Sequence, residues 1–215
     1  MSLFALGKDL VFPPVHLSEP DGLLAMGGDL STGRLLLAYR SGIFPWFDGP
    51  TPLWWCPNPR FVLFPPELKV SKSMKQLMKK QSFEFTVNKD FAGVINNCKT
   101  TARKDQEGTW ITNDVKEAYI RLHQLGHAHS AETWLNGELV GGCYGIRMDR
   151  VFFGESMFSK TANASKYAFI NYVQLLQADK VQLIDCQVYT AHLESLGARM
   201  IERNKFIGLL DQLIG

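Results

Sequence analysis

The segment from His127 to Phe158 constrains the fold more than any other part of the chain. It contains three extended runs, His127–Trp134, Glu138–Ile146 and Arg150–Phe158, and Asn136-Gly137 separates the first two. Asn-Gly between extended runs is a strong signal for a tight hairpin, because both residues accept a positive φ. We therefore expect three consecutive antiparallel strands at the centre of the molecule.

Helices and further strands are expected on both sides of this meander. Ser71 can cap a helix, and Asp29 or Ser31 can cap another. The resulting order of helix, meander, helix, strand and helix predicts an α+β fold with a central, mostly antiparallel sheet, like that of acetyltransferase-like (GNAT-like) acyltransferases. The helices expected lie at about 33–40, 72–80, 91–98, 113–125, 163–176 and 205–213, and the further strands at 60–64, 83–87 and 181–186.

Pro65-Pro66 follows an apolar strand and indicates a domain boundary. We expect a small N-terminal α/β domain over 1–62 and an acetyltransferase-like domain over 63–215. The first domain contains two aromatic stretches, Gly42–Phe47 and Leu53–Pro57. They are either the core of a small domain or flat faces on which a base can stack.

The composition excludes several classes of protein. With 46% apolar and 20% charged residues the chain can bury a full core, and a net charge of +2 leaves nucleic-acid binding to a local patch. The four cysteines stand far apart, as expected for free thiols in a reducing compartment. No apolar run approaches membrane-spanning length and no leader pattern is present, so we expect a cytoplasmic protein without a membrane contact.

No metal or other cofactor is expected. The histidines His123, His127 and His129 lie close in sequence but straddle the helix-ending Gly126. They have no cysteine or carboxylate at ligand spacing, whereas ligating histidines normally come with a third ligand.

The strongest candidate site lies at the end of the strand Val181–Cys186. Asp185 and Gln187 have the same parity, so their side chains are expected on one face of the sheet. A carboxylate and a carboxamide there can orient and polarise a nucleophile. Alternatively, the two residues only cap the strand and bind loop amides.

A second polar group follows from the run Val151–Ser159. Glu155 comes shortly after an aromatic pair, and Gly154 lets a ligand approach the backbone. Many apolar groups with a few convergent polar ones are typical of a small-ligand pocket. The alternative is that Glu155 is a surface carboxylate.

A lysine-rich helix is expected after Ser71. Its apolar residues follow i, i+3, i+4 spacing and face inward, so its lysines fall largely on the outer face. This face is either simply solvated or a patch that follows nucleic-acid phosphates. The lysines are Lys72, Lys75, Lys79 and Lys80.

Eight short motifs in register resemble one known family from about residue 12 to about residue 200. They closely resemble bacterial leucyl/phenylalanyl-tRNA–protein transferase. The motifs are Gly22–Ser31, Gly42–Phe47, Trp54–Arg60, Glu107–Ile111, Leu125–Ser130, Gly154–Ser159, Asn163–Lys166 and Leu183–Val188.

The resemblance implies an enzyme that takes leucine or phenylalanine, and less readily methionine, from aminoacyl-tRNA. It joins the amino acid to the α-amino group of a protein beginning with Arg or Lys, which marks that protein for degradation. It implies that the Gln187 carboxamide oxygen receives the amine N–H and that Asp185 orients Gln187. Glu155 could bind the ester-side amino group or the basic side chain of the acceptor.

The resemblance also implies which residues bind the parts of the aminoacyl-tRNA donor. Trp46 and Trp110 would stack the terminal adenosine, and the lysine helix would follow acceptor-stem phosphates. The transferred side chain would occupy an apolar pocket, although its five residues could equally be plain core. These are Cys143, Phe152, Tyr172, Leu176 and Ile184, with Cys143 standing where methionine is common in the family.

Two other functions remain open on the residues alone. An acyl-CoA-dependent N-acetyltransferase would share the fold, but its glycine-containing pyrophosphate loop before a helix is absent from the sequence. A non-catalytic RNA-binding module would use the aromatic residues and lysines, but it would have no use for Asp185, Gln187 and Glu155.

Overall fold

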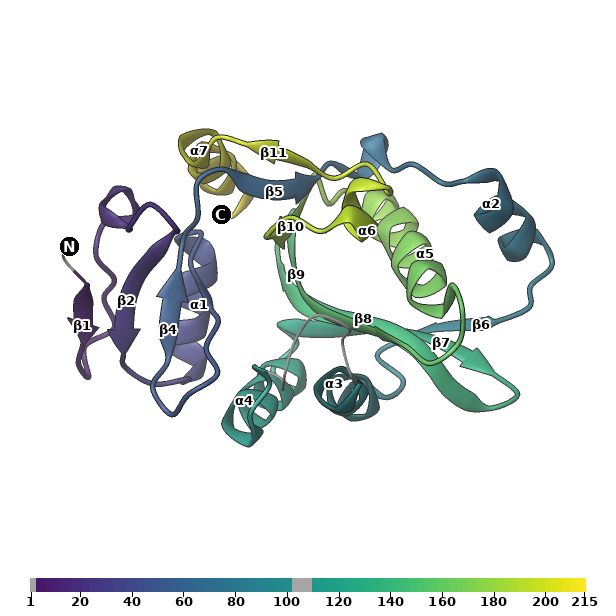
Figure 1. The fold of residues 1–215 in the computed structure, drawn as a ribbon, viewed down its shortest axis with the longest axis horizontal. Coiled ribbons are helices and arrows are strands. Elements are labelled where there is room, and N and C mark those ends of the chain that lie inside the picture. Colours follow the sequence, from purple (N-terminus) through teal and green to yellow (C-terminus); the bar gives the residue numbers. More distant parts are fainter. Residues whose placement is uncertain (1–2, 102–109) are drawn as a thin grey trace.

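The computed structural model describes residues 3–101 and 110–215. Figure 1 shows a small N-terminal unit beside a larger unit built on a long, twisted sheet. The polar sequence over 100–107 predicts a loop, but residues 102–107 and residues 107–109 of the fourth motif lie outside the described residues.

The N-terminal unit is a four-stranded sheet covered by one helix. The helix α1 (Thr32–Arg40) begins after Ser31, whose hydroxyl accepts a hydrogen bond from the Arg34 amide at 3.4 Å. Ser31 rather than Asp29 is therefore the cap. The strand order is β1-β2-β4-β3, with bounds Phe4–Leu6 (β1), Leu23–Gly27 (β2), Phe44–Pro45 (β3) and Leu53–Trp55 (β4), and a short 3-10 helix lies at Val15–Leu17.

The predicted meander forms the middle of the larger sheet. The strands β7 (Ala128–Leu135), β8 (Glu138–Met148) and β9 (Val151–Ser159) pair in antiparallel fashion. Asn136 and Gly137 join the first two with φ of 51° and 80°, as a type I′ hairpin requires.

The full strand order is β11-β5-β10-β9-β8-β7-β6. Among the described strands of this sheet only β9 and β10 are parallel neighbours, so the expected α+β class with a mostly antiparallel sheet is confirmed. The remaining bounds are Arg60–Leu63 (β5), Glu84–Val87 (β6), Leu183–Gln187 (β10) and Arg199–Ile201 (β11).

Helices cover both faces of this sheet. Figure 1 shows α3 and α4 on one face and α5 on the other, each near where the sequence predicts it. The helix bounds are Lys72–Lys79 (α2), Phe91–Thr100 (α3), Asn113–Gln124 (α4), Ala164–Ala178 (α5), Ala191–Glu194 (α6) and Arg203–Leu213 (α7), with a 3-10 turn at Pro65–Glu67.

The domain junction expected after residue 62 needs correction. It falls inside β5, which pairs with both β10 and β11 and so belongs entirely to the larger sheet. The small unit therefore ends before Arg60. Pro65 and Pro66 indicated where the strand ends, but prolines do not show which sheet a strand joins.

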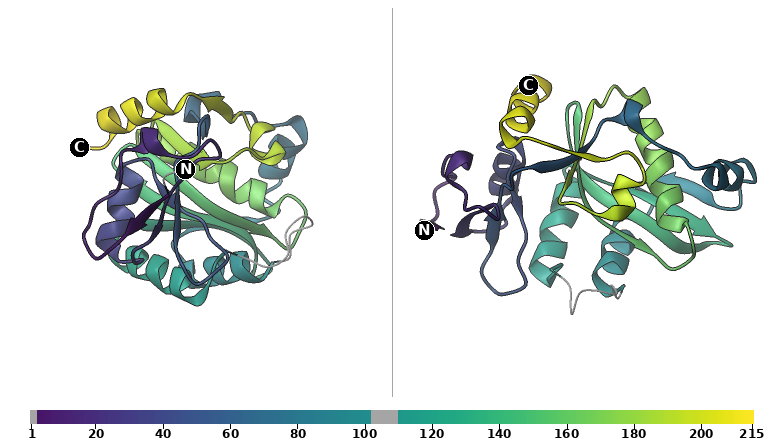
Figure 2. Two further views of the ribbon diagram at one scale, coloured as in Figure 1. Left: turned by 60° about the vertical axis from the view of Figure 1, so that its left-hand side comes forward. Right: turned by 45° about the horizontal axis from the view of Figure 1, so that its top comes forward.

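The C-terminal helix α7 packs against the N-terminal unit. A Cβ placed on Gly42, whose φ is 74°, would lie 2.5 Å from the Ile207 side chain. Phe206 and Leu210 of α7 share one hydrophobic cluster with Phe44. Figure 2 shows this helix above the N-terminal unit, so the last element of the chain ties the two units together.

The described residues hold no grouping of three or more His, Cys, Asp or Glu side chains that could bind a metal ion. His123 instead stacks on Phe91 with ring centroids 4.3 Å apart. The four cysteines are buried, and no disulfide links them. Over the ranges 3–101 and 110–215 no helix is long and apolar enough to cross a membrane.

Candidate active site

A cavity of about 470 Å³ opens between the large sheet, the segment after β10 and the N-terminal unit. Aromatic, polar and apolar side chains line different parts of it. Its described lining residues are Phe44, Pro45, Trp46, Thr101, Trp110, Tyr144, Gly154, Glu155, Ser156, Met157, Phe158, Ser159, Ser165, Phe169, Ile184, Cys186, Gln187, Val188, Thr190, His192 and Leu193.

Gln187 faces this cavity at the end of β10. Its φ is 62°, and the register with β5 shifts between Asp185 and Gln187. The irregularity breaks the strict alternation of side chains, so Gln187 lines the cavity whereas Asp185 does not. The expectation that both side chains lie together on one face of the sheet therefore needs correction.

Asp185 is buried against a partner that the sequence analysis missed. Arg60 donates from Nε to Oδ1 at 2.8 Å and from Nη2 to Oδ2 at 2.7 Å, and both residues are fully buried. Asp185 Oδ1 also accepts the backbone N–H of Gln187 at 2.9 Å. Asp185 thus orients the backbone of Gln187 rather than its carboxamide. In the sequence, the only signal that pointed to Arg60 was its position at the end of the Trp54–Arg60 motif.

Glu155 is what holds the Gln187 carboxamide. Its Oε1 accepts from Gln187 Nε2 at 2.8 Å and is also 2.8 Å from Tyr39 Oη. Its Oε2 is 2.9 Å from Tyr119 Oη. The surface alternative is removed, because Glu155 lines the cavity with all these partners around it. Nothing in the sequence singled out the two tyrosines, which read as core positions of two amphipathic helices.

This environment changes the acid strength of Glu155. Burial raises the pKa of its carboxyl to about 7, although the hydrogen bonds from Tyr39, Tyr119 and Gln187 work in the opposite direction. The nearby charge of Asp185 adds to the rise. A carboxyl in this range exchanges its proton near neutral pH.

The aromatic end of the cavity contains Phe44, Trp46 and Trp110. Trp46 is 43% exposed and Trp110 is 6% exposed, whereas Trp54 is fully buried. Trp54 therefore belongs to the core, whereas Trp46 is partly exposed and its use as a stacking face stays a prediction. Trp55 Nε1 donates to the Trp46 carbonyl at 2.6 Å, which steadies the segment that carries Trp46.

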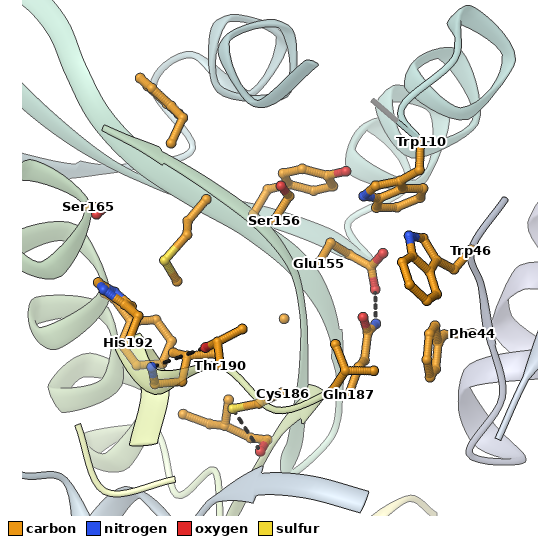
Figure 3. A pocket seen from close by; sticks show the side chains of 18 of the residues that line it. Phe44, Trp46, Trp110, Glu155, Ser156, Ser165, Cys186, Gln187, Thr190 and His192 are labelled. Carbon is orange, nitrogen blue, oxygen red and sulfur yellow. Dashed lines mark hydrogen bonds between the residues drawn. The ribbon is translucent and has the colours of Figure 1, made fainter. Parts of the chain in front are cut away.

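The apolar end lies on the other side of the Glu155–Gln187 pair. Figure 3 shows Phe44, Trp46 and Trp110 on one side of that pair and Ser165, Thr190 and His192 on the other. The apolar lining residues Met157, Phe169, Ile184 and Leu193 belong to the hydrophobic cluster between the sheet and α5, the helix that carries Ser165.

The expected apolar pocket needs correction at four of its five positions, since only Ile184 lines the cavity. The other four are buried in the hydrophobic cluster between the sheet and α5. Phe152 and Tyr172 pack edge to face with centroids 5.1 Å apart, and Cys143 and Leu176 belong to the same cluster. Their side chains pack behind the residues that line the cavity and do not line it themselves.

The predicted lysines are exposed on or next to α2, and none of them lines the cavity. Ser71 caps this helix as expected, accepting from the Met74 amide at 3.2 Å. Figure 1 shows α2 at the far end of the molecule from the N-terminal unit. Both alternatives for Lys72, Lys75, Lys79 and Lys80 therefore stand.

These contacts define what the cavity can do chemically. Gln187 Nε2 is committed to Glu155, and within the described residues no hydrogen bond occupies Gln187 Oε1. That oxygen is a fixed acceptor for an N–H group. Flat aromatic faces lie on one side of it and an apolar slot on the other, so the cavity suits a ligand with a ring system, a reacting centre and an apolar side chain.

Comparison with known proteins gives consistent matches. Residues 62–211 match the family model described as leucyl/phenylalanyl-tRNA protein transferase, and residues 28–58 match the model of its N-terminal domain. The leucyl/phenylalanyl-tRNA–protein transferase of Syntrophobacter fumaroxidans is 54% identical over 215 residues, covering 100% of this chain and 92% of the relative. That of Flavobacterium johnsoniae is 53% identical over 209 residues, covering 97% and 99%.

Solved structures resemble the chain only distantly. L-PGS from Bacillus licheniformis aligns with a TM-score of 0.43 at 12% identity, over 78% of this chain and 54% of that one. A GCN5-related N-acetyltransferase from Kribbella flavida aligns with a TM-score of 0.38 at 9% identity, over 79% and 60%.

Proposed function

The chain belongs to the leucyl/phenylalanyl-tRNA–protein transferase family, and on that premise we propose how its cavity carries out aminoacyl transfer and on which acceptors. The protein is an aminoacyltransferase that moves an amino acid from tRNA to a protein. We propose that the amino acid is leucine or phenylalanine, less readily methionine. We propose further that the acceptor is the α-amino group of a protein beginning with Arg or Lys, which the product marks for degradation in the cytoplasm.

The single observation that carries the proposal is the orientation of Gln187. Glu155 accepts the carboxamide N–H at 2.8 Å, which leaves Oε1 as the acceptor that faces the cavity. An incoming α-amine has a pKa of about 7.7–8.0, so an appreciable fraction is neutral at neutral pH. Such an amine needs orientation more than a strong base, and a fixed carbonyl oxygen orients it through one N–H.

The two ends of the cavity fit the two parts of the donor. Trp46 and Trp110 offer faces for the terminal adenosine, and stacking of this kind is worth about 1–3 kcal/mol per base. The slot lined by Met157, Phe169 and Ile184 accepts an apolar side chain that is aromatic or not branched at Cβ. The lysines of α2 would follow phosphates of the acceptor stem.

The reaction itself needs no cofactor. The aminoacyl ester is already activated, so the enzyme must position the amine and keep water away from the ester. Family membership gives no support to the two alternatives, an acyl-CoA-dependent N-acetyltransferase and a non-catalytic RNA-binding module.

A transfer assay tests the proposal. Radiolabelled Leu, Phe, Met and Ile are each supplied on tRNA with acceptor proteins that differ only in an N-terminal Arg, Lys or Ala. We expect label from Leu and Phe, and less from Met, on the Arg and Lys proteins. Isoleucine and the Ala protein serve as matched controls. Absence of transfer from any charged tRNA would remove the proposal.

A further inference from the structure

Three oxygen–oxygen contacts form a closed ring at the Glu155 carboxyl group. Tyr39 Oη lies 2.8 Å from Oε1, Tyr119 Oη lies 2.9 Å from Oε2, and the two tyrosine hydroxyls also contact each other directly. The tyrosines come from α1 and α4, and both are fully buried. A helix of the N-terminal unit thus reaches the carboxyl group next to Gln187.

A count of protons shows which ionisation state completes this ring. Each contact needs one proton between its two oxygens, and each tyrosine hydroxyl supplies one. With Glu155 neutral, Oε2–H donates to Tyr119, Tyr119 donates to Tyr39, and Tyr39 donates to Oε1. With Glu155 ionised, both hydroxyls donate to the carboxylate and the contact between them has no proton. The closed ring therefore fits a protonated Glu155.

The surrounding charges agree with this assignment. Burial raises the pKa of Glu155 and the charge of Asp185 adds to the rise, whereas the donors Tyr39, Tyr119 and Gln187 lower it, and together these effects place the pKa at about 7. The ionisable groups facing Glu155 are Tyr39 of α1, Tyr119 of α4, Asp185 of β10 and Arg60 of β5, and Tyr144 of β8 packs on Tyr119.

The carboxyl group of Glu155 lies close to the groups that react in the proposed function. In Figure 3 the carboxyl group lies between Gln187 and the rings of Trp46 and Trp110. In the proposed function these are the sites of the amine and of the terminal adenosine. The ester oxygen, which joins the amino acid to the ribose, then lies between them.

We propose that Glu155 is the proton-carrying catalytic residue of the transfer, and that Tyr39 and Tyr119 are the positioning residues that orient its carboxyl group. The inference rests on the proposed function. It gives Glu155 a role other than binding the amino group or the basic side chain of the acceptor.

The proposed step is balanced in atoms and charge. The amine nitrogen bonds to the ester carbonyl carbon, and the bond from that carbon to the ribose oxygen breaks. Glu155 gives its proton to the departing oxygen, which leaves as a hydroxyl group. The new amide nitrogen gives up its surplus proton to Glu155, which ends neutral as it began.

Infrared spectroscopy of the substrate-free protein tests the proton directly. We expect a protonated-carboxyl band that disappears as the pH rises through about 7. The band should be missing in Glu155→Gln and should persist to higher pH in Tyr39→Phe, because a donor to the carboxylate is lost. Tyr167→Phe, which removes a hydroxyl bonded to the Phe83 carbonyl at 3.1 Å, is the matched control and should leave the band unchanged. No band, or one that survives Glu155→Gln, would overturn the proposal.

A change of the leaving atom tests the proton transfer. A donor with sulfur in place of the ribose 3′-oxygen releases a thiolate, which needs less help from an acid because thiols have a pKa near 8.5. Glu155→Gln should slow transfer from the oxygen ester by about 10²–10⁴-fold and transfer from the sulfur ester by less than about 10-fold. Equal losses would show a merely structural role. If the wild type transfers from neither donor, the proposed function fails instead, and the infrared result still stands by itself.

Discussion

The guanidinium group of Arg60 holds the Asp185 carboxylate at two points, with Nε–Oδ1 at 2.8 Å and Nη2–Oδ2 at 2.7 Å. The rings of Phe44 and Phe206 lie over the guanidinium carbon, each with its centroid 4.7 Å away. The same carboxylate accepts the backbone N–H of Gln187 at 2.9 Å. A buried ion pair thus connects an aromatic wall of the cavity, the C-terminal helix and Gln187.

Arg60→Met is expected to destabilise the protein strongly. It leaves the Asp185 carboxylate buried without its partner, which typically costs about 3–5 kcal/mol. Chemical unfolding measures the loss. The Arg60→Met/Asp185→Leu double variant should recover part of it, since no unpaired charge remains. If the double variant is as unstable as the sum of the two single variants, the two charges are not coupled.

The exposed pair of Arg199 and Glu67 provides a matched control. Its bidentate geometry is similar, with distances of 2.8 and 3.0 Å, but both side chains are nearly half exposed. Exposed ion pairs contribute less than about 1 kcal/mol. Glu67→Gln should therefore change the unfolding free energy far less than Arg60→Met.

Trp46→Ala is expected to weaken donor binding without lowering the rate of transfer in the bound complex. Trp46 is 43% exposed at the aromatic end, so its removal costs little core packing and mainly removes a stacking face. Binding of an aminoacyl-adenosine analogue should weaken by about 1–3 kcal/mol. Calorimetry gives the affinity and single-turnover transfer gives the rate. Unchanged affinity would mean that adenosine does not stack on this ring.

Met157→Ala is expected to favour phenylalanine over leucine. The side chain lines the apolar end of the cavity, and apolar pockets separate neighbouring ligands by about 1–3 kcal/mol per methylene. The ratio of kcat/KM for Phe and Leu should rise by about 10-fold. Cys143→Ala is the control, because Cys143 lies behind the wall: it should alter stability and leave the ratio unchanged. If Cys143→Ala changed the Phe/Leu ratio and Met157→Ala did not, Cys143 would belong to the side-chain pocket.

Replacing Lys75 and Lys79 by Gln separates the two explanations of the lysine helix. If the lysines contact phosphates, the dependence of log K on log salt for aminoacyl-tRNA should become shallower by about two units. Binding of aminoacyl-adenosine should not change, since it lacks the acceptor stem. An unaltered salt slope would leave these lysines as a solvated face.

The fold was predictable where local signals suffice. The Asn136-Gly137 hairpin, the Ser31 and Ser71 caps and the meander all depend on turn and capping preferences of a few neighbouring residues. The assignment of β5 to the large sheet was not predictable, because its partners Ile184 and Met200 are more than 100 residues away in sequence. Strand pairing over such distances leaves no local trace.

The polar residues of the candidate site were predictable from the sequence, but the hydrogen bonds between them were not. Gln187 and Glu155 stand out because polar residues follow apolar strands. Their hydrogen bond, however, depends on a backbone irregularity with a positive φ at Gln187, which a simple alternation rule contradicts. Tyr39 was hidden because a buried tyrosine in an amphipathic helix looks like any core residue until its hydroxyl partner is known.

The most direct test of the account is the single-turnover rate of Leu or Phe transfer by Gln187→Ala at saturating donor and acceptor. Removing the carboxamide oxygen should lower this rate by about 10²-fold or more, by analogy with other groups that orient reacting atoms. Gln182→Ala, an exposed glutamine just before the same strand, should match the wild type. Full transfer by Gln187→Ala, with donor affinity and folding intact, would contradict the central claim that this fixed oxygen receives the amine.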